Sequence, residues 1–215
     1  MIDDMAYHHE VWYDIIVNDL GANLTREEVK LQLYGKSQEV LTRIFGPQRF
    51  TERELDRICL DKEKKYQLLY KPHLDLIGGL FHFLEQSYNE KIKMAIGTAA
   101  TSFNIDFVVD TLKLRHYFSA VVSADDVKKS KPDPETYLRA AQLLNVSPSD
   151  CIVFEDAPKG VEAARNAGMK AVVITTMHPK EDFATYDNVL TAAEDYVSLS
   201  PSLLCAGAKT TAEQK

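Results

Sequence analysis

The chain has 215 residues, of which 45% are hydrophobic, enough to bury a medium-sized core together with a smaller one. Its formal net charge is -7 and no cluster of lysines and arginines offsets it, which argues against binding to nucleic acid or to an anionic membrane surface. No apolar stretch is long enough to cross a bilayer, and the first residues are acidic, so we expect a cytoplasmic protein without a membrane anchor or a secretory signal.

Apolar residues recur at helical spacing from about residue 5 to residue 71, which predicts an all-helical first half. Two capping boxes, Thr25 with Glu28 and Thr51 with Glu54, predict the starts of two of these helices, because each pair can satisfy the free amides of a first helical turn. The predicted helix ends fall at three glycines: Gly21, Gly35 and Gly46.

After Pro72 short apolar runs alternate with amphipathic segments, the pattern of a mostly parallel sheet covered by helices on both faces. The predicted strands are residues 93–97, 120–123, 151–154 and 171–174. The predicted helices between them are residues 77–87, 103–114, 134–144 and 160–167. Right-handed crossovers then give an α/β protein with a Rossmann-like core. From residue 201 to residue 215 small and polar residues predict a flexible tail.

Ligands of an open parallel sheet bind beyond the carboxyl ends of its strands, so the residues that follow each apolar run are the informative ones. Thr98 follows the first run, Lys131 comes after the second, and Glu155 and Asp156 continue the third. A phosphoryl group in transfer is stabilised by a hydroxyl, a fixed cation and a metal ion on carboxylates. We therefore expect Thr98, Lys131 and Asp156 to meet at one anion-binding crevice, with Mg²⁺ as the metal.

Each of these residues also has a structural interpretation when it is taken alone. A threonine after a strand is often a helix cap, and a lysine before proline is often a solvated surface charge. Two adjacent acids at a sheet edge can simply be solvated or paired. Only the ordered set favours the functional interpretation.

Three segments carry a more specific signal: Ile96-Gly97-Thr98, Lys131-Pro132-Asp133-Pro134 and Val153-Phe154-Glu155-Asp156-Ala157-Pro158-Lys159-Gly160. They resemble three motifs of the haloacid dehalogenase superfamily, in its β-phosphoglucomutase-like branch, and the resemblance covers nearly the whole chain. It implies a Rossmann-like core, residues 1–3 and 74–200, and a four-helix cap, residues 4–73. It also implies a Mg²⁺-dependent phosphatase or phosphomutase that acts on small phosphorylated sugars, with Thr98 and Lys131 as catalytic residues and Asp156 and Glu155 at the metal.

The same resemblance implies roles for residues of the cap. His8 matches a catalytic position at the start of the cap, and Lys62 matches a lysine that reaches the substrate. Without the resemblance, His8 would be read as a capping or packing residue and Lys62 as a solvated one. Further substrate-binding positions, in a cap loop and next to Thr98, are Lys36, Ser37, Gln38 and Ala99. Gln38 stands where an arginine is common in mutases, which argues against an efficient sugar phosphomutase.

The start of the sequence departs from the family pattern. Family members open with a buried strand ending Asp-x-Asp-Gly, whose first aspartate attacks phosphorus and whose second acts as acid and base. Residues 2–8 align with a later segment, so we expect this strand to be absent from the given sequence and the chain as given to be inactive. Asp3 and Asp4 do not replace the two acids, because adjacent residues of an extended segment point opposite ways; we expect a helix cap there. We interpret Met1 as an internal methionine of a longer gene product.

Two functions stay open. The first is a phosphotransferase whose nucleophile lies outside the sequence, and the alternative is a non-catalytic protein that binds a sugar phosphate or a partner. A signalling receiver domain is set aside, because its acids precede its threonine and lysine. Dehalogenation is disfavoured, because it needs no metal-binding acid such as Asp156. The pattern specifies neither the substrate nor the oligomeric state.

Overall fold

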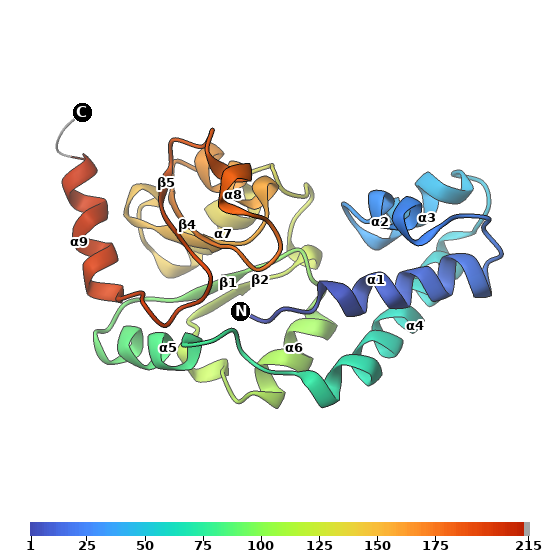
Figure 1. Cartoon of the computed structure of the whole chain (residues 1–215), viewed down its shortest axis with the longest axis horizontal. Helices are drawn as coiled ribbons and strands as arrows, with labels where there is room; N and C mark the ends of the chain where they lie inside the picture. Colours follow the sequence, from blue (N-terminus) through green and yellow to red (C-terminus); the bar gives the residue numbers. More distant parts are fainter. Residues whose placement is uncertain (213–215) are drawn as a thin grey trace.

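The structure, a computed structural model, describes residues 1–212 as a helical cap beside an α/β core (Figure 1). The cap helices are α1 (Met5–Tyr13), extended by a π-helical segment (Asp14–Asp19), α2 (Arg26–Gln32), α3 (Ser37–Phe45) and α4 (Glu52–Tyr70). Both predicted capping boxes are confirmed, with Thr25 and Thr51 as the N-caps of α2 and α4. The cap has its own small apolar core: Trp12, Ile16, Val29, Val40 and Leu41.

Two short segments connect the cap to the core. The carbonyl of Met1 accepts a hydrogen bond from the amide of Ile77 (3.0 Å), so the incoming and outgoing connections lie side by side. Asp4 is the N-cap residue of α1, as predicted, but its side chain makes no capping bond. It accepts a hydrogen bond from the Tyr66 hydroxyl of α4 instead (2.5 Å). This buried tyrosine therefore fastens the first connection to the longest helix of the cap.

The core alternates strands and helices along the chain. Its strands are β1 (Ala95–Gly97), β2 (Ala120–Val122), β3 (Ile152–Glu155), β4 (Lys170–Ile174) and β5 (Val189–Ala193). Its helices up to β4 are α5 (Leu80–Asn89), α6 (Ser102–Thr111), α7 (Glu135–Leu144) and α8 (Pro158–Asn166). The predicted parallel α/β fold is confirmed, since every strand pair is parallel. The sequence prediction missed β5, whose half-exposed residues form no continuous apolar run.

Side chains alternate across the strands and so divide the core into two apolar layers. Ile152 and Phe154 of β3 pack in the layer formed by α5 and α6, whereas Val153 packs in the layer formed by α7 and α8. The same alternation holds in β4, where Val172 and Val173 point to opposite layers. Helices thus cover both faces of the strands, because every second residue must be buried on each side.

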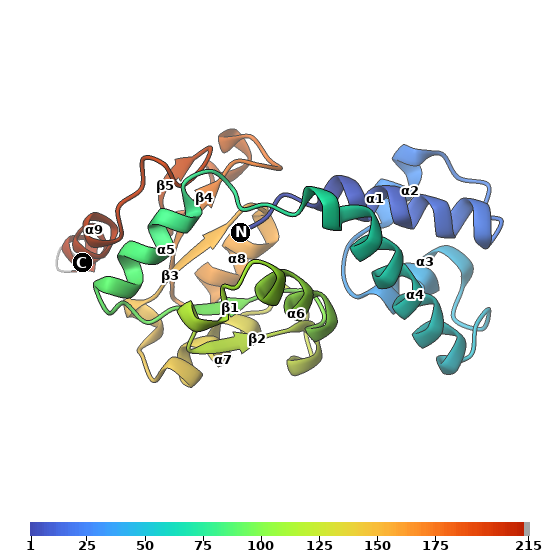
Figure 2. The same ribbon diagram turned by 90° about the horizontal axis from the view of Figure 1, so that it is seen from below.

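The strands form two sheets, β1–β2 and β3–β4–β5. Figure 2 shows them as separate groups, and β1 and β3 make no ladder with each other. Residues of both strands line one cavity of about 1930 Å³. One backbone edge of β1 and one of β3 are therefore unused by these two sheets. The absence of a central strand from this sequence stays a prediction.

The predicted flexible tail was wrong over residues 201–212, which form helix α9 (Pro201–Ala212). Pro201 is buried at the first position of this helix, where proline is favoured, and Leu204 packs against the α5–α6 layer. The last residues of the predicted tail, 213–215, lie outside the described part of the chain. Within residues 1–212, no helix combines the length and the apolar character that a bilayer crossing requires.

Gly79, which precedes α5, can be compared with Gly21 of the cap to test the packing at the start of α5, because both have left-handed backbones. Gly79 (φ +76°) would place an added Cβ 2.5–2.8 Å from backbone atoms of Tyr196 and Val197, whereas a Cβ at Gly21 (φ +74°) meets nothing within 4 Å. Gly21→Ala should therefore lower the free energy of unfolding by the backbone cost alone, about 1 kcal/mol. Gly79→Ala should cost about 3 kcal/mol, because the clash adds to the backbone cost. Urea unfolding of both variants measures the difference, and equal losses would contradict the packing described for Gly79.

Candidate active site

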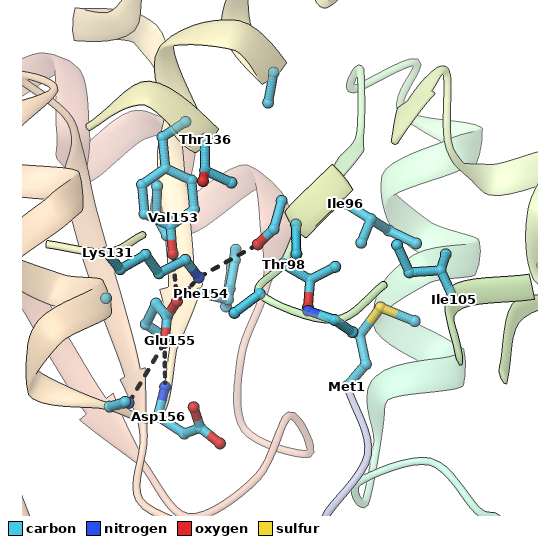
Figure 3. Close-up of a pocket in the computed structure, with 18 of the residues that line it drawn as sticks. Met1, Ile96, Thr98, Ile105, Lys131, Thr136, Val153, Phe154, Glu155 and Asp156 are labelled. Atoms are coloured by element: carbon cyan, nitrogen blue, oxygen red, sulfur yellow. Dashed lines mark hydrogen bonds and ion pairs between the residues drawn. The ribbon is translucent and has the colours of Figure 1, made fainter. Parts of the chain in front are cut away.

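Glu155, the last residue of β3, holds a carboxylate that is 9% exposed at the carboxyl end of the strands. The Lys131 ammonium is ion-paired with its Oε1 (Figure 3). The Tyr137 hydroxyl donates to the same oxygen. Oε2 accepts from the amides of Asp156 (3.2 Å) and Ala157 (3.4 Å). Burial alone would raise the pKa of Glu155, but the adjacent Lys131 charge and these hydrogen bonds hold that pKa below its usual value. Glu155 is therefore an ionised anchor for Lys131.

The ammonium of Lys131 also joins the two sheets. Besides its ion pair with Glu155 of β3, it donates to the carbonyl of Gly97 in β1 (3.4 Å). Thr98 follows at once, with its amide bonded to the carbonyl of Val122 (3.0 Å) and its Oγ1 accepting from the amide of Ala100 (3.1 Å). Thr98 follows β1 and Lys131 lies on the loop after β2, so a hydroxyl and a cation are held at the same edge of the strands.

Asp156 leaves the end of β3 in a different direction from Glu155, as Figure 3 shows and as alternation along an extended segment requires. Its Oδ2 lies 3.5 Å from the Thr176 hydroxyl on the loop after β4. Burial and then the negative charge of Glu155 raise the pKa of Asp156. A cation bound at this carboxylate would offset both effects.

The residues fit a magnesium site built on Asp156. Mg²⁺ commonly takes one or two carboxylates and completes its shell with water and phosphate oxygens. Glu155 fits less well as a direct ligand, because both of its carboxylate oxygens already accept hydrogen bonds. Among residues 1–212, no group of three or more His, Cys, Asp and Glu side chains could hold a metal ion. The predicted site therefore depends on Asp156 and on ligands that arrive with the substrate.

From the cap, the loop before α3 reaches the core. The Lys36 ammonium donates to the carbonyls of Ala124 (3.3 Å) and Val127 (3.1 Å), which follow β2. A second contact places the Lys159 ammonium of α8 4.6 Å from the ring centroid of Tyr34. These contacts hold the cap loop over the carboxyl ends of the strands.

The next two residues of the loop differ in what they touch. Ser37 opens α3 and lines the cavity. The amide of Gln38 donates to Asp56 Oδ1 of α4 (2.7 Å), so this side chain is engaged within the cap. The position at which an arginine is common in the resembling mutases is therefore occupied by a residue bonded to its own domain.

The pair His8 and Lys62 lies deeper in the cap. Lys62 is 4% exposed, so its interpretation as a solvated residue was wrong. Its ammonium lies 2.8 Å from His8 Nδ1, and the His8 ring stacks on Tyr66 with 3.9 Å between centroids. Burial lowers the pKa of Lys62, although the adjacent Glu63 carboxylate counteracts this effect.

A single cavity brings the predicted site together. Its lining includes each predicted residue: Thr98, Ala99, Lys131, Glu155 and Asp156 from the core, and His8, Lys36, Ser37, Gln38 and Lys62 from the cap. The expected meeting of Thr98, Lys131 and Asp156 at one crevice is thus what the structure shows. The catalytic, substrate-binding and metal roles given to these residues stay predictions.

Two residues that shape the site were missed. Tyr137 of α7 is a buried hydrogen-bond donor to Glu155, and an apolar helix face gave no sign of that contact. Gly160 of α8 lies in the third motif segment, and the sequence alone indicated no role for it. An added Cβ there would overlap the Glu155 carboxylate, so the glycine leaves room for the buried acid.

Comparison with known proteins places this site in a family. The sequence profile described as haloacid dehalogenase-like hydrolase matches residues 8–174, more than half of the chain. The chain belongs to the haloacid dehalogenase-like hydrolase family. The family predicted from the motifs, with its β-phosphoglucomutase-like branch, is thereby confirmed.

Relatives of this hydrolase include enzymes that act on phosphorylated sugars. It is 33% identical over 186 residues to the beta-phosphoglucomutase of Bacillus subtilis, covering 83% of this chain and 81% of that protein. It is 49% identical to the fructose-1-phosphate phosphatase of Escherichia coli over 87 residues, 40% of this chain and 46% of that protein. Over 141 residues it is 33% identical to the validoxylamine A 7'-phosphate phosphatase of Streptomyces hygroscopicus, with 66% of each chain covered.

Solved structures share the fold of this hydrolase. A haloacid dehalogenase-type hydrolase from Entamoeba histolytica superimposes with a TM-score of 0.86 at 23% identity, covering 97% of this chain and 95% of that one. The beta-phosphoglucomutase of Clostridium difficile gives a TM-score of 0.82 at 23% identity, with 99% and 94% covered. At this identity the likeness supports the fold and nothing finer.

The ion pair at the sheet edge can be tested against a neighbouring lysine. Lys131→Met leaves the Glu155 carboxylate buried without its cation, which should lower the free energy of unfolding by about 3 kcal/mol at neutral pH. Lys129→Met removes a lysine that is 74% exposed and paired with Asp133, and should change stability by less than about 0.5 kcal/mol. Denaturant unfolding at pH 7 measures both.

The pH dependence of the same variants gives a second measurement. In the parent protein the lowered pKa of Glu155 contributes stability above the carboxyl pKa of the unfolded chain, about 4.3, and this contribution is lost as the pH falls. In Lys131→Met the pKa of Glu155 should rise, so the deficit of the variant should shrink toward pH 4. A deficit that is constant with pH would contradict an ionised Glu155.

Proposed function

We propose that this protein is a Mg²⁺-dependent phosphohydrolase or phosphotransferase of small phosphorylated sugars that acts in the cytoplasm. The observation that carries the proposal is the convergence of Thr98, Lys131 and Asp156 on one cavity that the cap covers. Family membership and the relatives named for sugar-phosphate substrates support the same reaction class.

Each residue would have a distinct part in phosphoryl transfer. The Thr98 hydroxyl and the Lys131 ammonium would stabilise the phosphoryl oxygens, and Glu155 would keep Lys131 charged and in place. Asp156 would hold Mg²⁺, which neutralises phosphate charge when it is bound. From the cap, His8, Lys36 and Lys62 would contact the sugar phosphate. The engagement of Gln38 with Asp56 favours hydrolysis over mutase activity.

The phosphoryl group would pass through an aspartyl-phosphate on a residue that the given sequence does not supply. We assign that aspartate to a strand ending Asp-x-Asp-Gly between β1 and β3. The separation of the two sheets and the cavity lined by both strands support this position. The facing edges could bond such a strand on both sides, which would convert the two sheets into one.

The test is to extend the chain at its amino end with a strand that carries Asp-x-Asp-Gly. The extended protein should hydrolyse an aryl phosphate and sugar phosphates in a Mg²⁺-dependent reaction, whereas the chain as given should not. Thr98→Val should lower kcat of the extended protein about 10²- to 10³-fold, with Thr98→Ser as the matched control that keeps the hydroxyl. Asp156→Asn should raise the Mg²⁺ concentration that half-maximal activity requires.

Two outcomes would count against the proposal. An extended protein that is inactive on every phosphate but binds a sugar phosphate by calorimetry would favour a non-catalytic sugar-phosphate binder. Turnover that is equally fast without Mg²⁺ would contradict the metal role of Asp156.

A further inference from the structure

The cap and the core also meet at a polar contact between two helices, α4 and α6. The Asn104 side chain on α6 donates through Nδ2 to Glu63 Oε2 (2.6 Å) and accepts at Oδ1 from Gln67 Nε2 (3.0 Å). The same Gln67 nitrogen lies 3.1 Å from the carbonyl of Phe103. Glu63 and Gln67 are one helical turn apart, so α4 holds both ends of the Asn104 amide.

This contact is buried, which makes its polar pairing significant. Asn104 is 5% exposed and Glu63 is 7% exposed. A buried amide or carboxylate that loses its hydrogen-bond partner raises the free energy of the folded state. Asn104 and Glu63 are paired with each other only while the cap is docked on α6, so their pairing favours the docked arrangement. An apolar contact of the same size would tolerate sliding of the two helices, whereas the two hydrogen bonds of Asn104 define one register.

The contact continues into the substrate side of the cap. The Glu63 carboxylate also accepts from the Lys62 ammonium (3.0 and 3.1 Å), and that ammonium reaches His8 Nδ1 (2.8 Å). It lies 5.5 Å from the ring centroid of Trp12, so an aromatic face covers it as well. Glu63 thus connects Asn104 of the core to a lysine that lines the cavity.

On the core side, the contact falls on the segment that carries Thr98. α6 begins at Ser102, directly after the Thr98 loop, and Asn104 lies in its first turn. The Ser102 amide is fixed by Asp125 Oδ2 (2.9 Å). A cap docked on Asn104 is consequently docked on the same short segment that presents the Thr98 hydroxyl.

We infer that Asn104, Glu63 and Gln67 form a docking latch between cap and core, and that Glu63 positions the Lys62 ammonium in the cleft. The positioning of Lys62 toward a substrate rests on the proposed function. The docking itself does not, because it concerns contacts of the protein alone. Asn104 and Glu63 are positioning residues, since they act through Lys62.

The first experiment measures docking by hydrogen exchange on the chain as it stands. Asn104→Ala should speed hydrogen exchange at least about tenfold in the last turns of α4 and the first turn of α6. Leaving a buried polar group unpaired changes the opening equilibrium by about that factor or more. Exchange in β4 should stay unchanged, which shows that the core is folded. Asn89→Ala, which removes an exposed amide from the end of α5, is the matched control and should exchange as the parent does.

Exchanging the amide and the carboxylate between positions 104 and 63 tests whether the contact depends on this specific hydrogen bond or on packing in general. Asn104→Asp alone places two carboxylates together and should open the contact as Asn104→Ala does. Combining it with Glu63→Gln restores an amide and a carboxylate in reversed roles, and Gln67 can still donate to residue 104. The double variant should therefore recover slow exchange. Parent-like exchange in both single Asn104 variants, or no recovery in the double variant, would overturn the latch.

The second experiment uses the extended, active protein and tests the placement of Lys62. Asn104→Ala should raise KM for a sugar phosphate about tenfold while changing kcat/KM for a small aryl phosphate little, because only the larger substrate reaches the cap. The role-exchanged double variant should dock but keep a raised KM, because Lys62 has lost its charged partner. Equal losses on both substrates would overturn the positioning of Lys62. A failed proposed function would abolish turnover in every variant and leave the exchange results intact.

Discussion

A negative charge buried at the end of β3 imposes the arrangement of the whole site. Glu155 is ionised away from bulk water, so every element near it must supply a donor or leave space. The Lys131 loop brings the cation, and α7 brings the Tyr137 hydroxyl. The turn before α8 brings two backbone amides, and α8 leaves space at Gly160. Because Lys131 also bonds to Gly97, the same charge couples the two sheets.

The side chains that line the cavity come from two parts of the protein, the core and the cap, which are packed differently. The core supplies groups that are fixed by strand ends, such as Thr98 and Asp156, and the cap supplies longer cationic side chains, such as Lys36 and Lys62. Strand ends give precise positions, because a neighbouring strand and two helical layers constrain them. The cap residues depend on how the cap docks, which makes the α4–α6 contact as relevant to the cleft as the residues that line it.

Chain order explains which parts of this structure could be predicted. Parallel strands place their carboxyl ends at one edge, so the positions of Thr98, Lys131 and Asp156 in the sequence already indicated one crevice. The sequence could not predict that Glu155 pairs with Lys131 while Asp156 points away from it, because this depends on which side of β3 faces α7. Strand β5 and helix α9 were missed because the first lies at a half-exposed edge and the second is built from small residues that also suit a tail. Asn104 gave no sign of its role, since one polar residue in a helix contacts the cap only through the folded arrangement.

The two carbonyls that hold Lys36 have a thermodynamic consequence. Its ammonium has already exchanged part of its water shell for the oxygens of Ala124 and Val127. If Lys36 contacts a phosphate, as we propose, the phosphate oxygen would replace a neutral carbonyl and would not have to displace a complete water shell. Part of the free-energy cost of desolvating this lysine would then be met during folding, before any anion binds.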